Sequence, residues 1–143
     1  MLIILDFQVE WKIKNWATVK RKQYLSSDKF TIGDFTWFFG LYPDGDNEDS
    51  KGYVSIYLFA DLTTLPKGKF ISLDFEIIIV HPTNPRNSLK KDFTTVFPVK
   101  GGQGWGDRKT VKSIKIEEDG FLKQDTLTVS AVMTVKKTHL LIH

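Results

Sequence analysis

Residues 52–61 read GYVSIYLFAD, and their two alternating faces decide how the chain folds. The face of even-numbered positions is apolar and consists of Val54, Ile56, Leu58 and Ala60. The face of odd-numbered positions consists of Tyr53, Ser55, Tyr57 and Phe59. Alternation with a period of two predicts a half-buried β-strand. Because antiparallel sheets usually keep their outer face polar, the aromatic face is either covered by a loop or exposed as a binding platform.

The same period of two continues outward along the chain. It recurs in residues 7–13, 34–43 and 126–135, and residues 72–80 are strand-like on both faces. Turn-forming residues crowd residues 42–52 and 81–88. We expect an all-β fold, a two-layer antiparallel sandwich of about seven or eight strands. Short helical turns are expected near residues 16–20 and 111–120.

Size and composition indicate one folded domain over residues 1–143. The chain is 41% apolar and 13% aromatic, which suits a large core, and its net charge is +3. It has no cysteine, which excludes disulfides, zinc–thiolate sites and cysteine nucleophiles and is typical of an intracellular protein. The apolar start MLIIL is too short to span a bilayer and leads directly into a strand. We expect a domain from a longer cytoplasmic or nuclear protein.

The glycine-rich stretch GGQGWGDRK, residues 101–109, invites a phosphate-binding interpretation. Gly101 and Gly106 have the spacing of a P-loop, but Asp107 stands where such a loop needs lysine. An acidic side chain at that position repels phosphate. We therefore expect no nucleotide cofactor here.

The sequence contains little evidence for a metal site or a catalytic site. The acidic turn with Asp44, Asp46, Glu48 and Asp49 lacks the glycine and the final glutamate of a calcium-binding loop, so we interpret it as a solvated hairpin turn. The three histidines come with no recognisable catalytic motif. We expect no enzyme, no metal and no cofactor.

Basic residues alternate with aromatic residues between Trp11 and Tyr24, which can indicate binding to nucleic acid. However, Trp11 has the core phase of its strand, whereas Lys12 and Lys14 have the outer phase. A solvated outer face explains these lysines. Binding of an acidic surface, either nucleic acid or anionic lipid, stays open as an alternative function.

Several segments, in order and over nearly the whole chain, resemble the MATH (meprin and TRAF homology) domain, a TRAF-C-like family. The matching segments are Trp11–Trp16, Tyr42–Gly45, Tyr53–Leu58, Trp105–Gly106, Gly120–Leu122 and Asp125–Val129. The resemblance implies a TRAF-like sandwich whose outer groove binds a short extended peptide of a partner or substrate. It also implies recruitment to ubiquitin-pathway or signalling machinery. The isolated domain should be monomeric or weakly associating, and the full-length protein oligomeric through neighbouring segments.

The resemblance also implies which residues form the groove. These are Tyr57, Trp105, Gly106, Leu73, Phe97 and Asp107. The chain departs from the family pattern at Gly104, at Asp107 after the WG pair and at Gly40, where relatives have other residues. The groove is therefore expected but not the family's peptide motif. The hypothesis is that Asp107, Arg108 and Lys109 supply new polar contacts. A structural spacer with a degenerate groove is a third alternative.

Overall fold

The computed structural model describes residues 1–5, 7–61, 63–64, 68–98 and 104–140, which form two antiparallel β-sheets with short helical turns. The strands are β1 (Leu2–Leu5), β2 (Gln8–Ile13), β3 (Leu25–Ser26), β4 (Phe30–Ile32), β5 (Phe35–Tyr42), β6 (Tyr53–Ala60), β7 (Lys69–Ile79), β8 (Leu89–Phe97), β9 (Trp105–Lys112), β10 (Leu122–Lys123) and β11 (Thr126–Leu140). The helices are α1 (Trp16–Val19) and α2 (Lys115–Glu118), with 3-10 turns η1 (Glu48–Ser50) and η2 (Pro85–Asn87).

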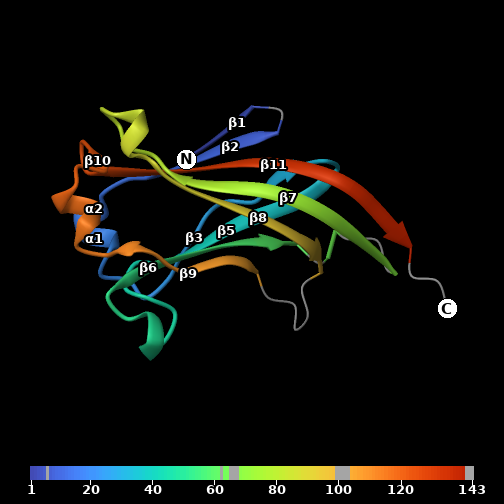
Figure 1. Cartoon of the computed structure of the whole chain (residues 1–143), viewed down its shortest axis with the longest axis horizontal. Coiled ribbons are helices and arrows are strands. Elements are labelled where there is room, and N and C mark those ends of the chain that lie inside the picture. Colours follow the sequence, from blue (N-terminus) through green and yellow to red (C-terminus); the bar gives the residue numbers. More distant parts are fainter. Residues whose placement is uncertain (6, 62, 65–67, 99–103, 141–143) are drawn as a thin grey trace.

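The sheets stack as the two layers visible in Figure 1. Sheet A has the order β1-β2-β11-β7-β8, with β10 also paired to β11. Sheet B has the order β3-β5-β6-β9, with β4 also paired to β5. The predicted antiparallel sandwich is confirmed. Seven of the described strands have six residues or more, and the other four have only two to four residues, too few to show an alternating pattern in sequence.

Aromatic rings join the two sheets through the core. Trp11 of β2 stacks parallel to Phe39 of β5, with ring centroids 5.9 Å apart. Trp37 of β5 meets Phe97 of β8 edge to face at 5.3 Å. The indole Nε1 of Trp37 donates a hydrogen bond to the carbonyl oxygen of Ile32 at 2.9 Å, so its polar atom is satisfied although the side chain is fully buried.

Two residues that the resemblance assigns to a groove belong to this core. Leu73 lies in β7 and Phe97 in β8, both in sheet A, and their side chains are 0% and 1% exposed. Strand alternation turns them inward, so neither side chain reaches the surface. The alignment of short motifs could not detect this, because it carried no information on strand phase.

The two predicted helical turns are present and lie together at one end of the sandwich (Figure 1). Each has one apolar residue in the core, Trp16 in α1 and Ile116 in α2. Lys20 and Glu117 form an ion pair of 2.6 Å between them. In the described part of the chain, no helix has the length and apolarity to cross a membrane.

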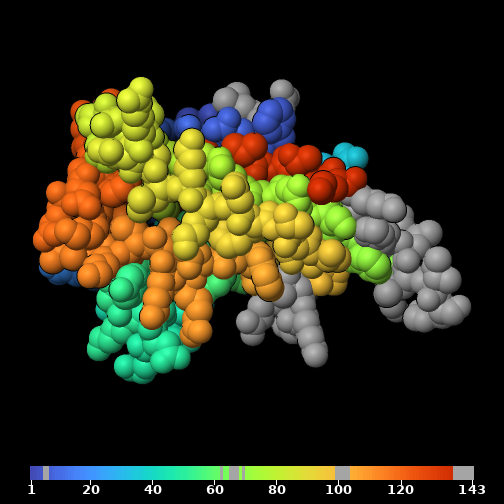
Figure 2. Space-filling model, in the orientation of Figure 1, coloured from blue at the N-terminus to red at the C-terminus, as the bar shows by residue number. Residues whose placement is uncertain are grey.

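The edge strands β8 and β9, from different sheets, run side by side and form a continuous surface in Figure 2, with β8 in yellow and β9 in orange. Lys91 pairs with the core residue Ile77, and Asp107 pairs with the core residue Ile56. Because paired residues share a face of the sheet, both charged residues belong to the inner faces of their strands. Lys91 Nζ lies 2.6 Å from Asp107 Oδ2. This ion pair connects the two sheets at β8 and β9.

Truncation of Leu73 should test its assignment to the core. Leu73→Ala removes fully buried apolar atoms and should lower the free energy of unfolding by about 2–5 kcal/mol, because the cavity cannot fully collapse. Urea unfolding measures the change. Ile4→Ala, at a residue that is 47% exposed, is the matched control and should cost less than about 0.5 kcal/mol. Equal losses would contradict the burial.

Candidate functional site

The outer face of sheet B is aromatic, as the odd-numbered positions of β6 predicted. Its rings are the half-buried Phe38, Tyr42, Tyr57 and Phe59 and the exposed Tyr24. Phe38 stacks on Phe59 at 5.0 Å, and Tyr24 packs on Tyr42 at 4.8 Å. Between the rings lies a pocket of about 340 Å³, lined by Tyr42, Asp46, Tyr57, Phe59 and Gly104. The face is thus partly covered and partly open, which combines the two interpretations left open by the sequence.

The loop between β5 and β6 covers one side of this pocket and is fixed by Asp46. Tyr57 donates its hydroxyl hydrogen bond to Asp46 Oδ2 at 2.7 Å, and Ser50 Oγ donates to Asp46 Oδ1 at 2.6 Å. Ser50 is fully buried, and its Oγ also accepts from the backbone N–H of Asp46 and Asn47. Asp46 is therefore part of the pocket wall, whereas Asp44, Glu48 and Asp49 are exposed, as expected for a solvated turn.

This hydrogen bond holds Asp46 ionised and Tyr57 neutral. Burial alone would raise the pKa of Asp46, but hydrogen bonds from Ser50 and Tyr57 outweigh it and lower the pKa below its ordinary value. Burial, together with the hydrogen bond to Asp46, raises the pKa of Tyr57. The pocket therefore contains a negative charge at neutral pH.

Two glycines allow the close contacts around the pocket. At Gly40 of β5, a Cβ atom would lie 2.5 Å from Tyr24 Oη and 2.7 Å from the ring of Phe59. At Gly106 of β9, directly opposite Tyr57, a Cβ atom would collide with the carbonyl oxygen of Ile56. Any side chain at either position would push rings or strands apart.

Strand β9 divides its residues between two faces. Trp105 pairs with Leu58 and Asp107 with Ile56, whose side chains are both in the core, so neither residue shares the face of Tyr57. Trp105 is nevertheless 41% exposed at the sheet edge. This geometry does not agree with the prediction that Trp105 and Asp107 form part of the wall of the pocket beside Tyr57.

A bulge redirects the next residues of β9. Val54 pairs with Val111 and Ile56 with Asp107, so residues 108–110 face the single residue Ser55, whose Oγ donates to the carbonyl oxygen of Arg108 at 2.6 Å. Arg108 Nε lies 3.8 Å from Asp46 Oδ1. Lys109 Nζ lies 5.4 Å from the ring centroid of Tyr53. Basic groups thus border the aromatic face.

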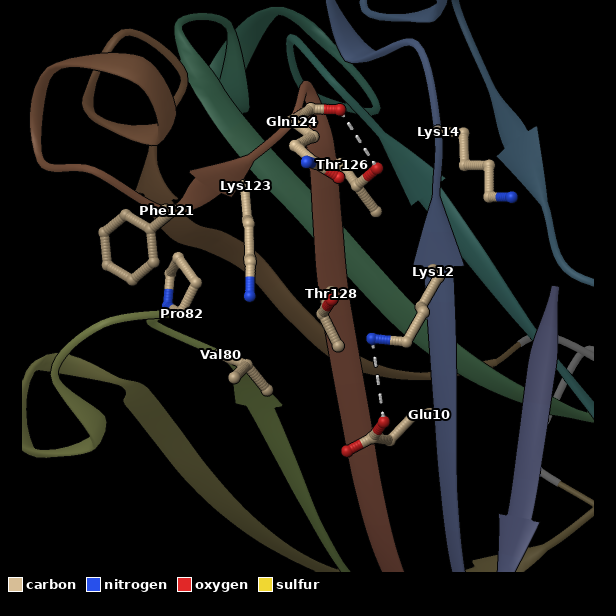
Figure 3. A pocket seen from close by; sticks show the side chains of 10 residues that line it. All are labelled: Glu10, Lys12, Lys14, Val80, Pro82, Phe121, Lys123, Gln124, Thr126 and Thr128. Atoms are coloured by element: carbon tan, nitrogen blue, oxygen red, sulfur yellow. Dashed lines mark hydrogen bonds and ion pairs between the residues drawn. The ribbon is translucent and has the colours of Figure 1, made fainter.

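A second hollow of about 430 Å³ lies on the outer face of sheet A (Figure 3). Figure 3 shows Lys12 directed toward Thr128 and Lys123 on the other side of Thr128, near Pro82, whereas Lys14 points away. Glu10 Oε2 lies 3.9 Å from Lys12 Nζ and offsets part of the positive charge. The alternative function, binding of an anionic surface, would use the lysines of this hollow.

The structure therefore brings together only part of the predicted site. Tyr57 lines the pocket and Gly106 pairs with Tyr57 on the neighbouring strand, whereas Trp105, Asp107, Leu73 and Phe97 lie on inner faces. Sequence reasoning named Asp46 only as part of the acidic turn and missed its place in the pocket, since its partner Tyr57 is eleven residues away on another element. Residues 101–103 of the glycine stretch lie outside the described residues. Among the residues that are described, no cluster of three or more His, Cys, Asp or Glu could hold a metal ion.

Comparison with known proteins agrees with this architecture. The sequence profile of the MATH domain matches residues 8–133. The chain belongs to the MATH domain family. The MATH domain is a protein–protein interaction module and is not itself catalytic.

The chain matches only part of the length of its larger relatives. A TNF receptor-associated factor family protein of Dictyostelium discoideum is 32% identical over 95% of this chain, which spans 29% of that protein. Ubiquitin C-terminal hydrolase 13 of Arabidopsis thaliana is 31% identical over 89% of this chain, which spans only 11% of the hydrolase. The solved structure of TRAF5 from Notothenia coriiceps shares the fold, with a TM-score of 0.71 at 20% identity, covering 96% of this chain and 78% of that one.

The Asp46 network should appear in the acid stability of the domain. Because the pKa of Asp46 is lowered in the folded state, its stabilisation is present above the ordinary value of 3.8 and is lost as the pH falls through the folded value. Asp46→Asn should therefore be less stable than the parent at neutral pH, and the difference should shrink below pH 3.8. Urea midpoints measured against pH test this. Asp49→Asn in the same loop is the matched control, and parallel curves for Asp46→Asn and parent would refute the assignment.

The ion pair between Asp107 and Lys91 should couple the two sheet edges. A double-mutant cycle with Asp107→Ala and Lys91→Ala should give a coupling on the order of 1 kcal/mol, limited because the Lys91 side chain is 52% exposed. Chemical denaturation of the four proteins measures this energy. The neighbouring Lys90→Ala should show no coupling to Asp107, and additive effects of the first pair would contradict the contact.

Proposed function

We propose that this domain binds a short extended peptide of a partner protein along the edge of β9, with one peptide side chain in the pocket beside Tyr57. The observation that carries the proposal is the position of that pocket. Its lining residues Tyr57 and Phe59 are on β6, and β6 pairs directly with β9, the last strand of sheet B. In the described part of the chain, no strand pairs with the outer edge of β9.

An edge strand beside an aromatic pocket suits recognition by strand addition. Backbone hydrogen bonds to the edge would supply affinity, and side-chain pockets would supply selectivity. The side chain opposite Gly106 would lie on the face of Tyr57. Its neighbours in the peptide would point to the other face, where Trp105 is exposed at the edge. In this arrangement Trp105 contacts the peptide, although it is not a wall of the pocket.

The bulge limits how long the added strand can be. Lys109 N–H donates to Asp107 Oδ1 at 3.0 Å, and Thr110 Oγ1 donates to the carbonyl oxygen of Asp107 at 3.1 Å. These groups are already bonded within the chain, so pairing would concentrate near Trp105 and Gly106. A short contact that also orders a flexible peptide should be weak, with a Kd in the micromolar range or above.

The domain would serve as the recruiting part of a larger protein. Its relatives, a TNF receptor-associated factor family protein and a ubiquitin C-terminal hydrolase, have MATH regions that make up only part of their length. We infer that this domain brings a partner or substrate to ubiquitin-pathway or signalling machinery in the cytoplasm or nucleus. Oligomerisation through segments outside this domain would raise the avidity.

Binding of an anionic surface through Lys12 and Lys123 is the alternative function. Such binding depends on release of counterions and falls steeply as salt increases. Binding of a peptide to an aromatic pocket should depend less steeply on salt, since much of its free energy comes from desolvated contacts. The salt dependence therefore separates the two functions.

A library of short acetylated and amidated peptides should test the proposal. We expect discrete binders, and Tyr57→Ala and Trp105→Ala should each weaken them on the order of tenfold, since buried aromatic residues dominate such interfaces. Fluorescence anisotropy measures the affinities. Phe7→Ala is the matched control, because Phe7 is 58% exposed on sheet A, and it should bind like the parent.

Two further readouts separate binding from folding and from charge. Tyr57→Phe keeps the ring and should retain most of the binding if Tyr57→Ala acts through the ring. Binders that survive about 0.5 M salt would support the pocket over the lysine hollow. Absence of any binder would leave the domain as a structural spacer. Peptides that all variants bind like the parent would show that binding does not use the pocket.

A further inference from the structure

The pocket beside Tyr57 has the composition of a binding site for a positively charged group. Its walls are three aromatic rings, those of Tyr42, Tyr57 and Phe59, together with the carboxylate of Asp46. The rings of Tyr42 and Tyr57 are nearly perpendicular, at 84°, with centroids 6.2 Å apart. The rings of Tyr57 and Phe59 meet at 60°, with centroids 6.3 Å apart. Rings set at steep angles around one space can direct negatively polarised faces toward a single guest.

We propose that the pocket formed by Tyr42, Tyr57, Phe59 and Asp46 binds the cationic side chain of a lysine or arginine in the partner peptide. This inference rests on the proposed peptide-binding function and specifies what the pocket selects. A cation would gain attraction from the rings and an ion pair with Asp46 at the same time.

Other guests suit the pocket less well. A carboxylate would be repelled by Asp46, whose Oδ1 and Oδ2 already accept hydrogen bonds from Ser50 and Tyr57. An aliphatic side chain would displace water from the remaining surface of this carboxylate without replacing its interactions, which costs free energy. The lowered pKa of Asp46 keeps the charge in place near neutral pH. Charge complementarity therefore selects a cation.

The molecule already places its own cations against this face. Lys109 Nζ lies 5.4 Å from the ring centroid of Tyr53, on the same strand as Tyr57. Arg108 Nε lies 3.8 Å from Asp46 Oδ1, which is long compared with about 2.8 Å for a strong charge-assisted hydrogen bond. The side chain of Arg108 is half exposed, so its charge is already partly solvated. We infer that Arg108 acts as an internal competitor, which the cation of the peptide displaces.

This competition gives Arg108 a role that distinguishes the possible guests. If the pocket takes a cation, Arg108→Gln removes a competitor and should tighten binding about threefold to tenfold. If the pocket takes an anion, Arg108 would be its partner and the same change should abolish binding. A gain in affinity cannot result from misfolding, which makes this variant the decisive one.

The test uses a positional-scanning library of acetylated and amidated heptapeptides with the 143-residue domain. Lysine or arginine should be enriched at one position, and replacing it by norleucine, which lacks the charge, should weaken binding on the order of tenfold. Asp46→Asn, which can still accept the hydrogen bond from Tyr57, should remove this preference for lysine over norleucine. Phe59→Leu should weaken lysine and norleucine peptides unequally, with the larger loss for lysine.

Each other outcome decides against the inference. Enrichment of Asp or Glu, with loss of binding in Arg108→Gln, would overturn the cation assignment and leave peptide binding intact. Enrichment of an uncharged residue, with Asp46→Asn binding as well as the parent, would do the same. If no peptide binds at all, the proposed function fails and this inference fails with it.

Discussion

Close packing between the inner faces of the two sheets is the constraint on which the rest of the molecule depends. Trp37 meets Phe97 at 5.3 Å and Trp11 stacks on Phe39 at 5.9 Å, and each pair joins one sheet to the other. Large rings fill the interior, so every long strand must turn its apolar phase inward. That requirement fixes which residues remain for the outer faces, where binding takes place.

The aromatic outer face of β6 is stable because neighbouring segments cover it only in part. Tyr24 lies over Gly40, and the loop with Asp46 and Ser50 closes the side near Tyr57. A fully exposed set of rings would favour aggregation, and a fully covered set could bind nothing. The pocket of about 340 Å³ is the part of this face that remains open beside β9.

The charged residues Asp107 and Arg108 of β9 contact different parts of the molecule because a bulge begins between them. Before the bulge, Asp107 lies on the inner face and joins β9 to Lys91 of the opposite sheet. After it, Arg108 reaches Asp46 on the outer face. Asp107 thus connects the two sheets, whereas its neighbour Arg108 borders the pocket. Substitution of Asp107 should affect stability, and substitution of Arg108 should affect recognition.

The sequence by itself determined the fold class, the inward phase of the long strands, the two helical turns and the unusual aromatic face with Tyr57. These features follow from local alternation, which the side-chain period of a strand makes readable. Only the tertiary structure decided that Leu73 and Phe97 are core residues and that Trp105 and Asp107 lie on the inner face of β9. Only it could bring Asp46 to Tyr57. Strand register, the bulge in β9 and contacts between distant segments set these positions, and they arise from how strands pair and pack, which no short stretch of sequence encodes.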